Sequence, residues 1–185
     1  MGILAMFRRR PHERAGFELY GAAVGAARTP ALFAVLGVPD TMEGRFDLVS
    51  LHVGLVIRRL RTDGDARGAA LAQAVFDAMF ADMDVNLREM GVGDMSVGKR
   101  VRGMWEAFHG RALAYETAFD SGDPAALAEA LARNVWRGAP PPGGAAEKLA
   151  AIARAQAAHL AGQGIDLLAT GRVAFLPAEE LIDAT

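Results

Sequence analysis

The chain has 185 residues, of which 52% are hydrophobic and 23% are charged, and its formal net charge at pH 7 is −2. These values predict a globular protein with a sizeable core, and they exclude a protein whose whole surface is built to coat nucleic acid. The sequence contains no cysteine. Disulfide bonds and thiolate chemistry are therefore excluded, and the composition suits a reducing compartment.

Residues 1–14 are predicted to form a flexible, basic tail in front of a helical domain at 15–185. Within the tail, the apolar residues 3–7 precede the arginines at 8–10. This order is the reverse of that in a secretory signal, and the run is too short for a membrane-spanning helix. Apolar side chains next to arginines also suit a weak contact with an anionic membrane surface.

Apolar residues that recur every three or four positions predict α-helices along most of the remaining chain. In chain order, the expected helices cover 17–28, a short segment from 30 that ends at Gly37, 41–62, 66–90, 97–119, 124–137 and 145–161. Asp40 or Thr41 is expected to cap the third helix and Asp123 the sixth, and the helix at 66–90 is expected to be central because its apolar face is wide. The segment 171–177 (GRVAFLP) is expected to be extended and to lie across the helices. Because it has no partner strand, the predicted fold class is all-α, a single compact multi-helix domain with a short extended C-terminal segment.

The stretch GVGDMSVGKR at 91–100 is similar to a phosphate-binding loop, but its context excludes that function. A phosphate loop follows a buried strand and has Ser or Thr after its lysine. Here a helical pattern precedes the stretch, and Arg100 follows Lys99. The glycines instead predict a corner between two helices.

The predicted corner has a specific local geometry. Gly91 is expected to adopt the left-handed conformation that ends a helix, with Val92 folding back on Leu87. Asp94 or Ser96 is expected to cap the free amides at the start of the next helix.

No metal site or catalytic group is predicted. The pattern Asp82-x-Asp84-x-Asn86 resembles the start of a calcium loop, but Leu87 occupies the position that requires glycine. The four histidines lie far apart in the sequence without the spacing of zinc ligands, and there is no Gly-x-Ser-x-Gly nucleophile motif. We therefore expect no metal, no cofactor and no catalysis.

Two groups of residues near the corner suggest a binding surface. Five of the eight methionines cluster there: Met79, Met83, Met90, Met95 and Met104. The basic residues beside them are Arg88, Lys99, Arg100, Arg102 and Arg111. Together they predict an apolar groove with a positive rim that accepts a helix of a partner protein. The alternatives are ordinary core packing for the methionines and a solvated face for the basic residues.

Three segments resemble the ubiquinol–cytochrome c chaperone family: GVPDTMEGRFDLVSLHVGLVIRRLR, DMDVNLREMGVGDMSVGKRVRGMWEAFHGRALAYETAF and GRVAFLP. The resemblance runs from about residue 17 to residue 177. It implies a mostly helical fold, no enzyme activity, and binding of newly made cytochrome b before that subunit joins ubiquinol–cytochrome c reductase. It also implies a bacterial-type, cytoplasmic protein associated with the inner face of the cell membrane, whereas eukaryotic relatives act in the mitochondrial matrix. The ribosome or another assembly factor is a further partner that the family suggests.

The resemblance and the basic group together give the candidate partner-binding residues: Arg45, Asp47, His52, Asp82, Asn86, Arg88, Glu89, Asp94, Lys99, Arg100, Arg111 and Tyr115. Four of them, Arg45, Asp47, Asp82 and Arg111, are equally compatible with a buried hydrogen-bond network that fixes helix packing. Two other functions stay open, an all-α enzyme and a small helical regulator that binds nucleic acid. The regulator is disfavoured because acidic residues lie among the basic ones, so a continuous basic face is not expected.

Overall fold

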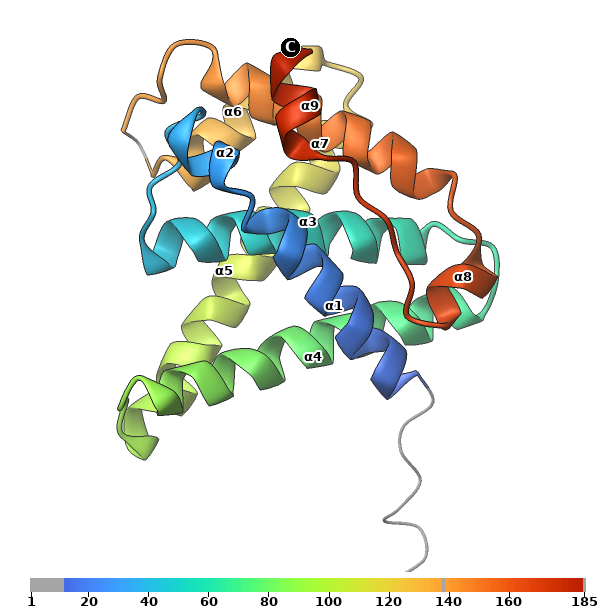
Figure 1. Cartoon of the computed structure of the whole chain (residues 1–185). Helices are drawn as coiled ribbons and strands as arrows, with labels where there is room; N and C mark the ends of the chain where they lie inside the picture. Colours follow the sequence, from blue (N-terminus) through green and yellow to red (C-terminus); the bar gives the residue numbers. More distant parts are fainter. Residues whose placement is uncertain (1–11, 138, 185) are drawn as a thin grey trace, which may run out of the picture.

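The structure is a computed structural model that describes residues 12–137 and 139–184. Within those residues the regular secondary structure is entirely α-helical, which confirms the predicted fold class (Figure 1). In chain order the helices are α1 (Glu13–Ala27), α2 (Pro30–Ala34), α3 (Met42–Arg61), α4 (Arg67–Glu89), α5 (Asp94–Asp120), α6 (Pro124–Val135), α7 (Ala145–Ala161), α8 (Ile165–Ala169) and α9 (Ala178–Asp183). No helix in this part of the chain combines the length and the apolar character needed to cross a lipid bilayer.

The first helix begins earlier than the sequence pattern indicates. α1 starts at Glu13 rather than at Phe17, so the predicted boundary between tail and domain at 14–15 falls inside a helix. Residues 1–11 of the predicted tail lie outside the described residues.

The helix at the centre of the molecule is α3, and the expectation that α4 is central was wrong. α3 packs against α1, α4, α5, α6 and α7, and its buried side chains include Leu48, Leu51, Val53 and Leu60. α4 lies along one side, where it contacts α1, α3, α5 and the short α8 (Figure 1). The periodic pattern of a helix shows how wide its apolar face is, but it does not show how many other helices pack around it.

The corner between α4 and α5 has the predicted backbone geometry. Gly91 has a φ of 77°; its N–H donates to the carbonyl of Arg88 at 2.9 Å, and the N–H of Val92 donates to the carbonyl of Leu87 at 3.1 Å. These two bonds satisfy carbonyls that the end of α4 would otherwise leave free. The predicted cap of the next helix was wrong, because Gly93 is the N-cap of α5 and no side chain caps it.

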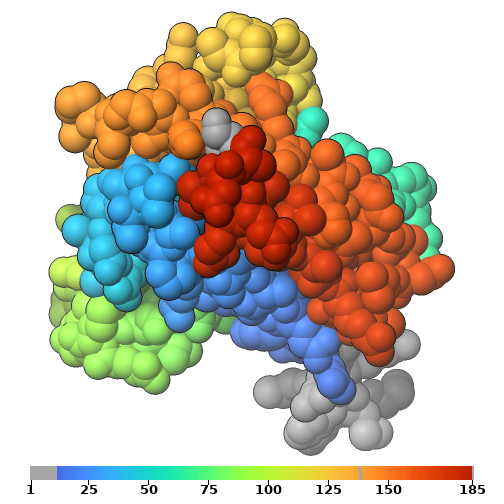
Figure 2. Space-filling view, turned by 45° about the horizontal axis from the view of Figure 1, so that its top comes forward, coloured from blue at the N-terminus to red at the C-terminus, as the bar shows by residue number. Residues whose placement is uncertain are grey.

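The C-terminal segment crosses the bundle as an extended chain, as predicted. The side-chain amide of Gln156 on α7 donates to the carbonyl of Leu176 at 2.8 Å and accepts from its N–H at 2.9 Å. Gln163 makes the same pair of bonds with Ala174. Figure 2 shows this segment and α9 in red, lying on the surface between the blue first helices and the orange α7. The short helices α8 and α9, on either side of the segment, were not predicted.

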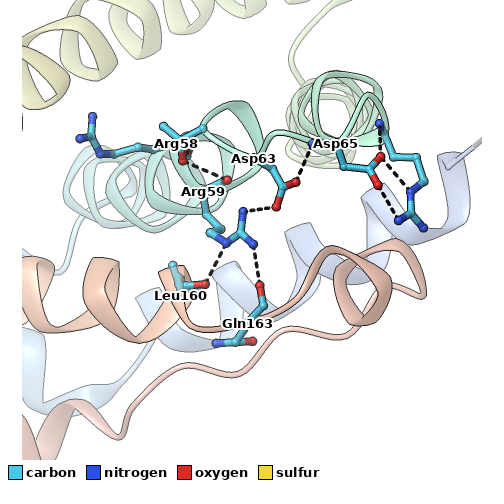
Figure 3. A network of polar contacts seen from close by, with 8 residues as sticks. Arg58, Arg59, Asp63, Asp65, Leu160 and Gln163 are labelled. Carbon is cyan, nitrogen blue, oxygen red and sulfur yellow. Dashed lines mark hydrogen bonds and ion pairs between the residues drawn. The ribbon is translucent and has the colours of Figure 1, made fainter.

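Arg59 joins the end of α3 to the end of α7 (Figure 3). Its guanidinium donates to the carbonyl of Leu160 at 3.1 Å and to that of Gln163 at 2.7 Å. Asp63 accepts a third bond at 2.6 Å. Because the last carbonyls of a helix have no partner inside it, this arginine stabilises the end of α7 and fixes its position on α3.

Candidate functional site

A groove of about 480 Å³ lies where α1, α3, α4 and α5 approach one another. Its apolar lining consists of Met42, Phe46, Val49, Met83, Leu87, Met90 and Met104. Its polar lining consists of Tyr20, Arg28, Asp40, Thr41, Arg45, Asp82 and Asn86. We call this hollow the methionine groove.

Three of the five methionines predicted to form a binding surface line this groove, namely Met83, Met90 and Met104. Met79 is fully buried in the core, and Met95 is 99% exposed at the corner between α4 and α5. The groove and the corner are adjacent, because Leu87 and Met90 belong to the last turn before the corner.

Hydrogen bonds hold the polar side chains of the groove in place. The hydroxyl of Tyr20 donates to the carboxylate of Asp82 at 2.7 Å, and Arg45 donates to Asp40 at 2.6 Å. The side chain of Asn86 donates to the backbone carbonyl of Asp82 at 2.8 Å. The hydrogen bond from Arg45 holds the pKa of the Asp40 carboxyl below its ordinary value. Burial, followed by the bond to Asp82, raises the pKa of Tyr20.

The charges around the groove are mixed, and the predicted positive rim is not found there. Arg28 and Arg45 contribute positive charge, whereas Asp40 and Asp82 contribute negative charge. A surface of this kind favours a partner segment with its own charges of both signs.

The corner carries the remaining exposed candidates. Arg88 donates to Asp84 on α4 at 2.6 Å and also pairs with Asp94 on α5, so it connects the two helices across the bend. The other candidate residues at the corner are exposed: Glu89, Lys99 and Arg100. All of these side chains are accessible to a partner that contacts the corner.

Asp47, by contrast, is completely buried between two guanidinium groups. Arg111 approaches its carboxylate to 2.7 Å, and Arg137 donates two hydrogen bonds to it, at 3.1 and 3.2 Å. Burial raises the pKa of Asp47, and the two arginines oppose this effect. Tyr115 is buried beside them, and burial also raises its pKa. The sequence did not predict Arg137, whose partner lies 90 residues away.

His52 is also inside the fold. The residue is 2% exposed, its Nδ1 lies 2.8 Å from the carbonyl oxygen of Leu48, and the ring of Phe175 lies against it at a centroid distance of 5.7 Å. Burial lowers the pKa of His52.

The twelve candidates therefore occupy three places. Asp47, His52, Arg111 and Tyr115 are packed inside the fold, where a partner protein does not reach them. The alternative of a buried network describes Asp47 and Arg111, but not Arg45 and Asp82, which line the groove. The other five residues lie at the corner.

A second hollow, of about 460 Å³, lies between α3, α4 and α5, and it was not predicted from the sequence. Its lining includes Phe76, Trp105, Phe108 and Phe119. Most of these aromatic residues belong to the periodic apolar stripes of α4 and α5, which predict core packing equally well. We call this hollow the aromatic cleft. Among the described residues, no group of three or more His, Asp or Glu side chains is arranged to hold a metal ion.

Residues 34–175 match the model of one protein family, described as ubiquinol–cytochrome C chaperone. The match includes the whole lining of the aromatic cleft, and all of the methionine groove except Tyr20 and Arg28. The chain belongs to this family.

Three named assembly factors and one crystal structure are similar to this chain over most of its length. The ubiquinol–cytochrome-c reductase complex assembly factor 1 of Xenopus laevis is 28% identical over 167 residues, which cover 90% of this chain and 82% of that protein. The assembly factors 1 of Mus musculus and Homo sapiens are likewise 28% identical over 167 residues, and the chain spans 56% and 55% of their lengths. The crystal structure of the Cbp3 homolog from Brucella abortus aligns with a TM-score of 0.80 at 34% identity, covering 96% of this chain and 98% of that one.

Proposed function

We propose that this protein is a non-catalytic assembly factor for ubiquinol–cytochrome c reductase, and that it binds newly made cytochrome b in the methionine groove. Family membership supports the first part, because the similar proteins of three vertebrates are named as assembly factors of that complex. The observation that carries the second part is the groove itself, which combines four methionines with fixed charges of both signs.

The chemistry of the groove suits an apolar segment of an unfinished membrane protein. Methionine is flexible and polarizable, so a surface rich in methionine adapts to apolar partners of different shapes. Met42 and Met90 are each about half exposed, 50% and 52%, and are therefore available for contact. An amphipathic helix end can bury its apolar side chains there, while the arginines and aspartates of the groove select its orientation.

The proposed client determines the proposed location. A subunit that is inserted into the membrane exposes its loops and helix ends at the membrane surface, so we expect this protein to act peripherally at the inner face of a bacterial cell membrane. The corner residues Lys99 and Arg100 are positioned for contact with the client, with an anionic membrane surface, or with a ribosome or another assembly factor that delivers the client.

The test places a negative charge at each half-exposed methionine of the groove. The double variant Met42→Asp with Met90→Asp should lower the yield of cytochrome b that co-purifies with the protein at least tenfold, because a carboxylate in an apolar contact has a high desolvation cost. The matched control is Val85→Asp. Val85 lies on α4, of which Met90 is the C-cap, is 51% exposed and lies outside the groove. Full recovery of cytochrome b with the double variant would refute the groove as the binding site.

A further inference from the structure

The aromatic cleft is lined on two sides by contacting rings. Phe76 on α4 lies 5.8 Å from Phe108 and 5.4 Å from His109, both on α5, measured between ring centroids. Trp105 stacks against His109 at 4.0 Å and is 45% exposed. A cleft with a volume of about 460 Å³ and aromatic walls falls in the range of small-molecule sites, which is about 300–1,000 Å³.

A glycine keeps the third side of the cleft open. Gly54 lies in the middle of α3 and belongs to the cleft lining. Apart from the adjacent backbone of α3 itself, a Cβ atom added to it would have no heavy atom within 4 Å. Glycine is unfavourable in a helix interior compared with alanine, and at this position no close neighbour requires it. Its effect is to leave space inside the cleft.

The charged residues that line the cleft are two arginines, Arg58 and Arg61, and one carboxylate, Glu116. Arg58 pairs with Asp120 at 2.6 Å and lies over the ring of Phe119. Arg61, at the end of α3, is exposed and forms no ion pair within the described part of the chain. Glu116 also lines the cleft, so one carboxylate is present as well. A ligand with a single acidic group would therefore be attracted by Arg61 and repelled by Glu116.

We propose that the aromatic cleft binds a small anionic amphiphile, with an alkyl or ring body between the aromatic walls and an acidic group beside Arg61. This site is separate from the methionine groove, and its occupation does not depend on the proposed client. The test needs only the purified 185-residue chain.

The probe is dodecanoate, titrated below its micelle concentration. Calorimetry should show saturable binding with one site, and the fluorescence of Trp105 should change on binding, because the other tryptophan, Trp136, is 4% exposed and lies outside the cleft. Trp105→Phe should remove the fluorescence change. Dodecanol and dodecyltrimethylammonium have the same chain with no charge or a positive charge, and each should bind at least tenfold more weakly.

Two pairs of variants test the cleft and its charges. Gly54→Leu fills the cleft and should weaken binding of dodecanoate at least tenfold, whereas Gly110→Leu, an equally open glycine of α5 outside the cleft, should leave it unchanged. Arg61→Gln should weaken binding about tenfold, and Glu116→Gln should tighten it severalfold. If Gly54→Leu loses its helical circular dichroism, Ala69→Trp at the exposed rim replaces it, with the same expected loss.

The proposal is overturned by any of three results. The first is the absence of saturable dodecanoate binding to the wild-type chain. The proposal is also overturned if an apolar peptide binds in the cleft and dodecanoate does not. The second is equal binding of the cationic and anionic amphiphiles. The third is full binding by a folded variant whose cleft is filled. None of these results bears on cytochrome b, so failure here is distinguishable from failure of the proposed function.

Discussion

The carboxylate of Asp47 joins three parts of the fold that are far apart in the sequence. It lies on α3, accepts from Arg137 beyond the end of α6, and pairs with Arg111 on α5. Burying an ion pair has a large desolvation cost, and removing one partner leaves the other charge buried without compensation. We therefore assign Asp47, Arg111 and Arg137 to the packing of these segments on one another.

Asp47→Ala should lower the free energy of unfolding by about 3 kcal/mol, because the buried guanidinium of Arg111 loses its partner. Urea denaturation measures this change. The control is Asp84→Ala, which removes a partly exposed ion pair with Arg88 and should cost about 1 kcal/mol or less. If the two variants lose the same free energy of unfolding, the buried ion pairs of Asp47 do not stabilise the fold more than an exposed pair does.

His52 should make the stability of the protein depend on pH. Burial lowers the pKa of its imidazole in the folded state from an ordinary value of 6.5. Below that pH the unfolded chain binds a proton that the folded chain does not, so the free energy of unfolding should fall as the pH decreases from about 7 to about 5. Urea denaturation at several pH values should give a smaller decrease for His52→Gln than for the wild type. The same slope in both would contradict this assignment.

At the scale of single elements, the sequence predicts best what is decided within a few residues. Thr41 caps α3 through the N–H of Gly44, and Asp123 caps α6 through the N–H of Ala125, both as expected. Gly91 ends α4 for the same local reason.

The short helices escaped prediction because tertiary contacts stabilise them. α8 and α9 have five and six residues, too few for a repeating pattern. Each buries an apolar side chain in the core, Leu168 in one case and Ile182 in the other. The observed bounds of α1 and α6 differ by a few residues from the predicted ranges 17–28 and 124–137. Local sequence signals do not fix the last turn of a helix, because tertiary packing can extend or shorten it.

Two glycines of α3 should respond to alanine in opposite directions. A Cβ on Gly44 would collide with the backbone carbonyl of Pro39, which has little freedom to move. Gly44→Ala should therefore lower the free energy of unfolding by about 1–3 kcal/mol. Gly54→Ala meets open space and should raise it by about 0.5–1 kcal/mol. Thermal or urea denaturation measures both, and a stabilised Gly44→Ala would refute the close approach of the 39–44 segment.

At the scale of the whole molecule, the candidate site was only partly predictable. The methionines near the corner correctly indicated three residues of the groove. Met83 in α4 and Met90 at its C-cap are about two helical turns apart, so they lie on the same side of the helix. The groove also needs Tyr20 and Arg45, which come from helices far from the corner in the sequence. Sequence patterns identify polar residues but not the direction in which their side chains point. The sequence therefore could not show that Asp47 is buried in the fold whereas Asp82 lines the groove.

The methionine groove and the aromatic cleft are lined by different parts of α3. The methionine groove uses its first turns, with Met42, Arg45 and Phe46, and the aromatic cleft uses its second half, with Gly54 and Arg58. A client in the groove and a small ligand in the cleft would thus contact the same central helix.

Site-specific photocrosslinking in cells tests the central claim most directly. A photoreactive amino acid is placed at Met90 in the groove, at the C-cap of α4, and, as the matched exposed position, at Val85 on α4 outside the groove. We predict that Met90 forms an adduct with cytochrome b and that Val85 does not. An adduct of equal yield from Val85, or none from Met90 while cytochrome b still co-purifies, would contradict the methionine groove as the binding site.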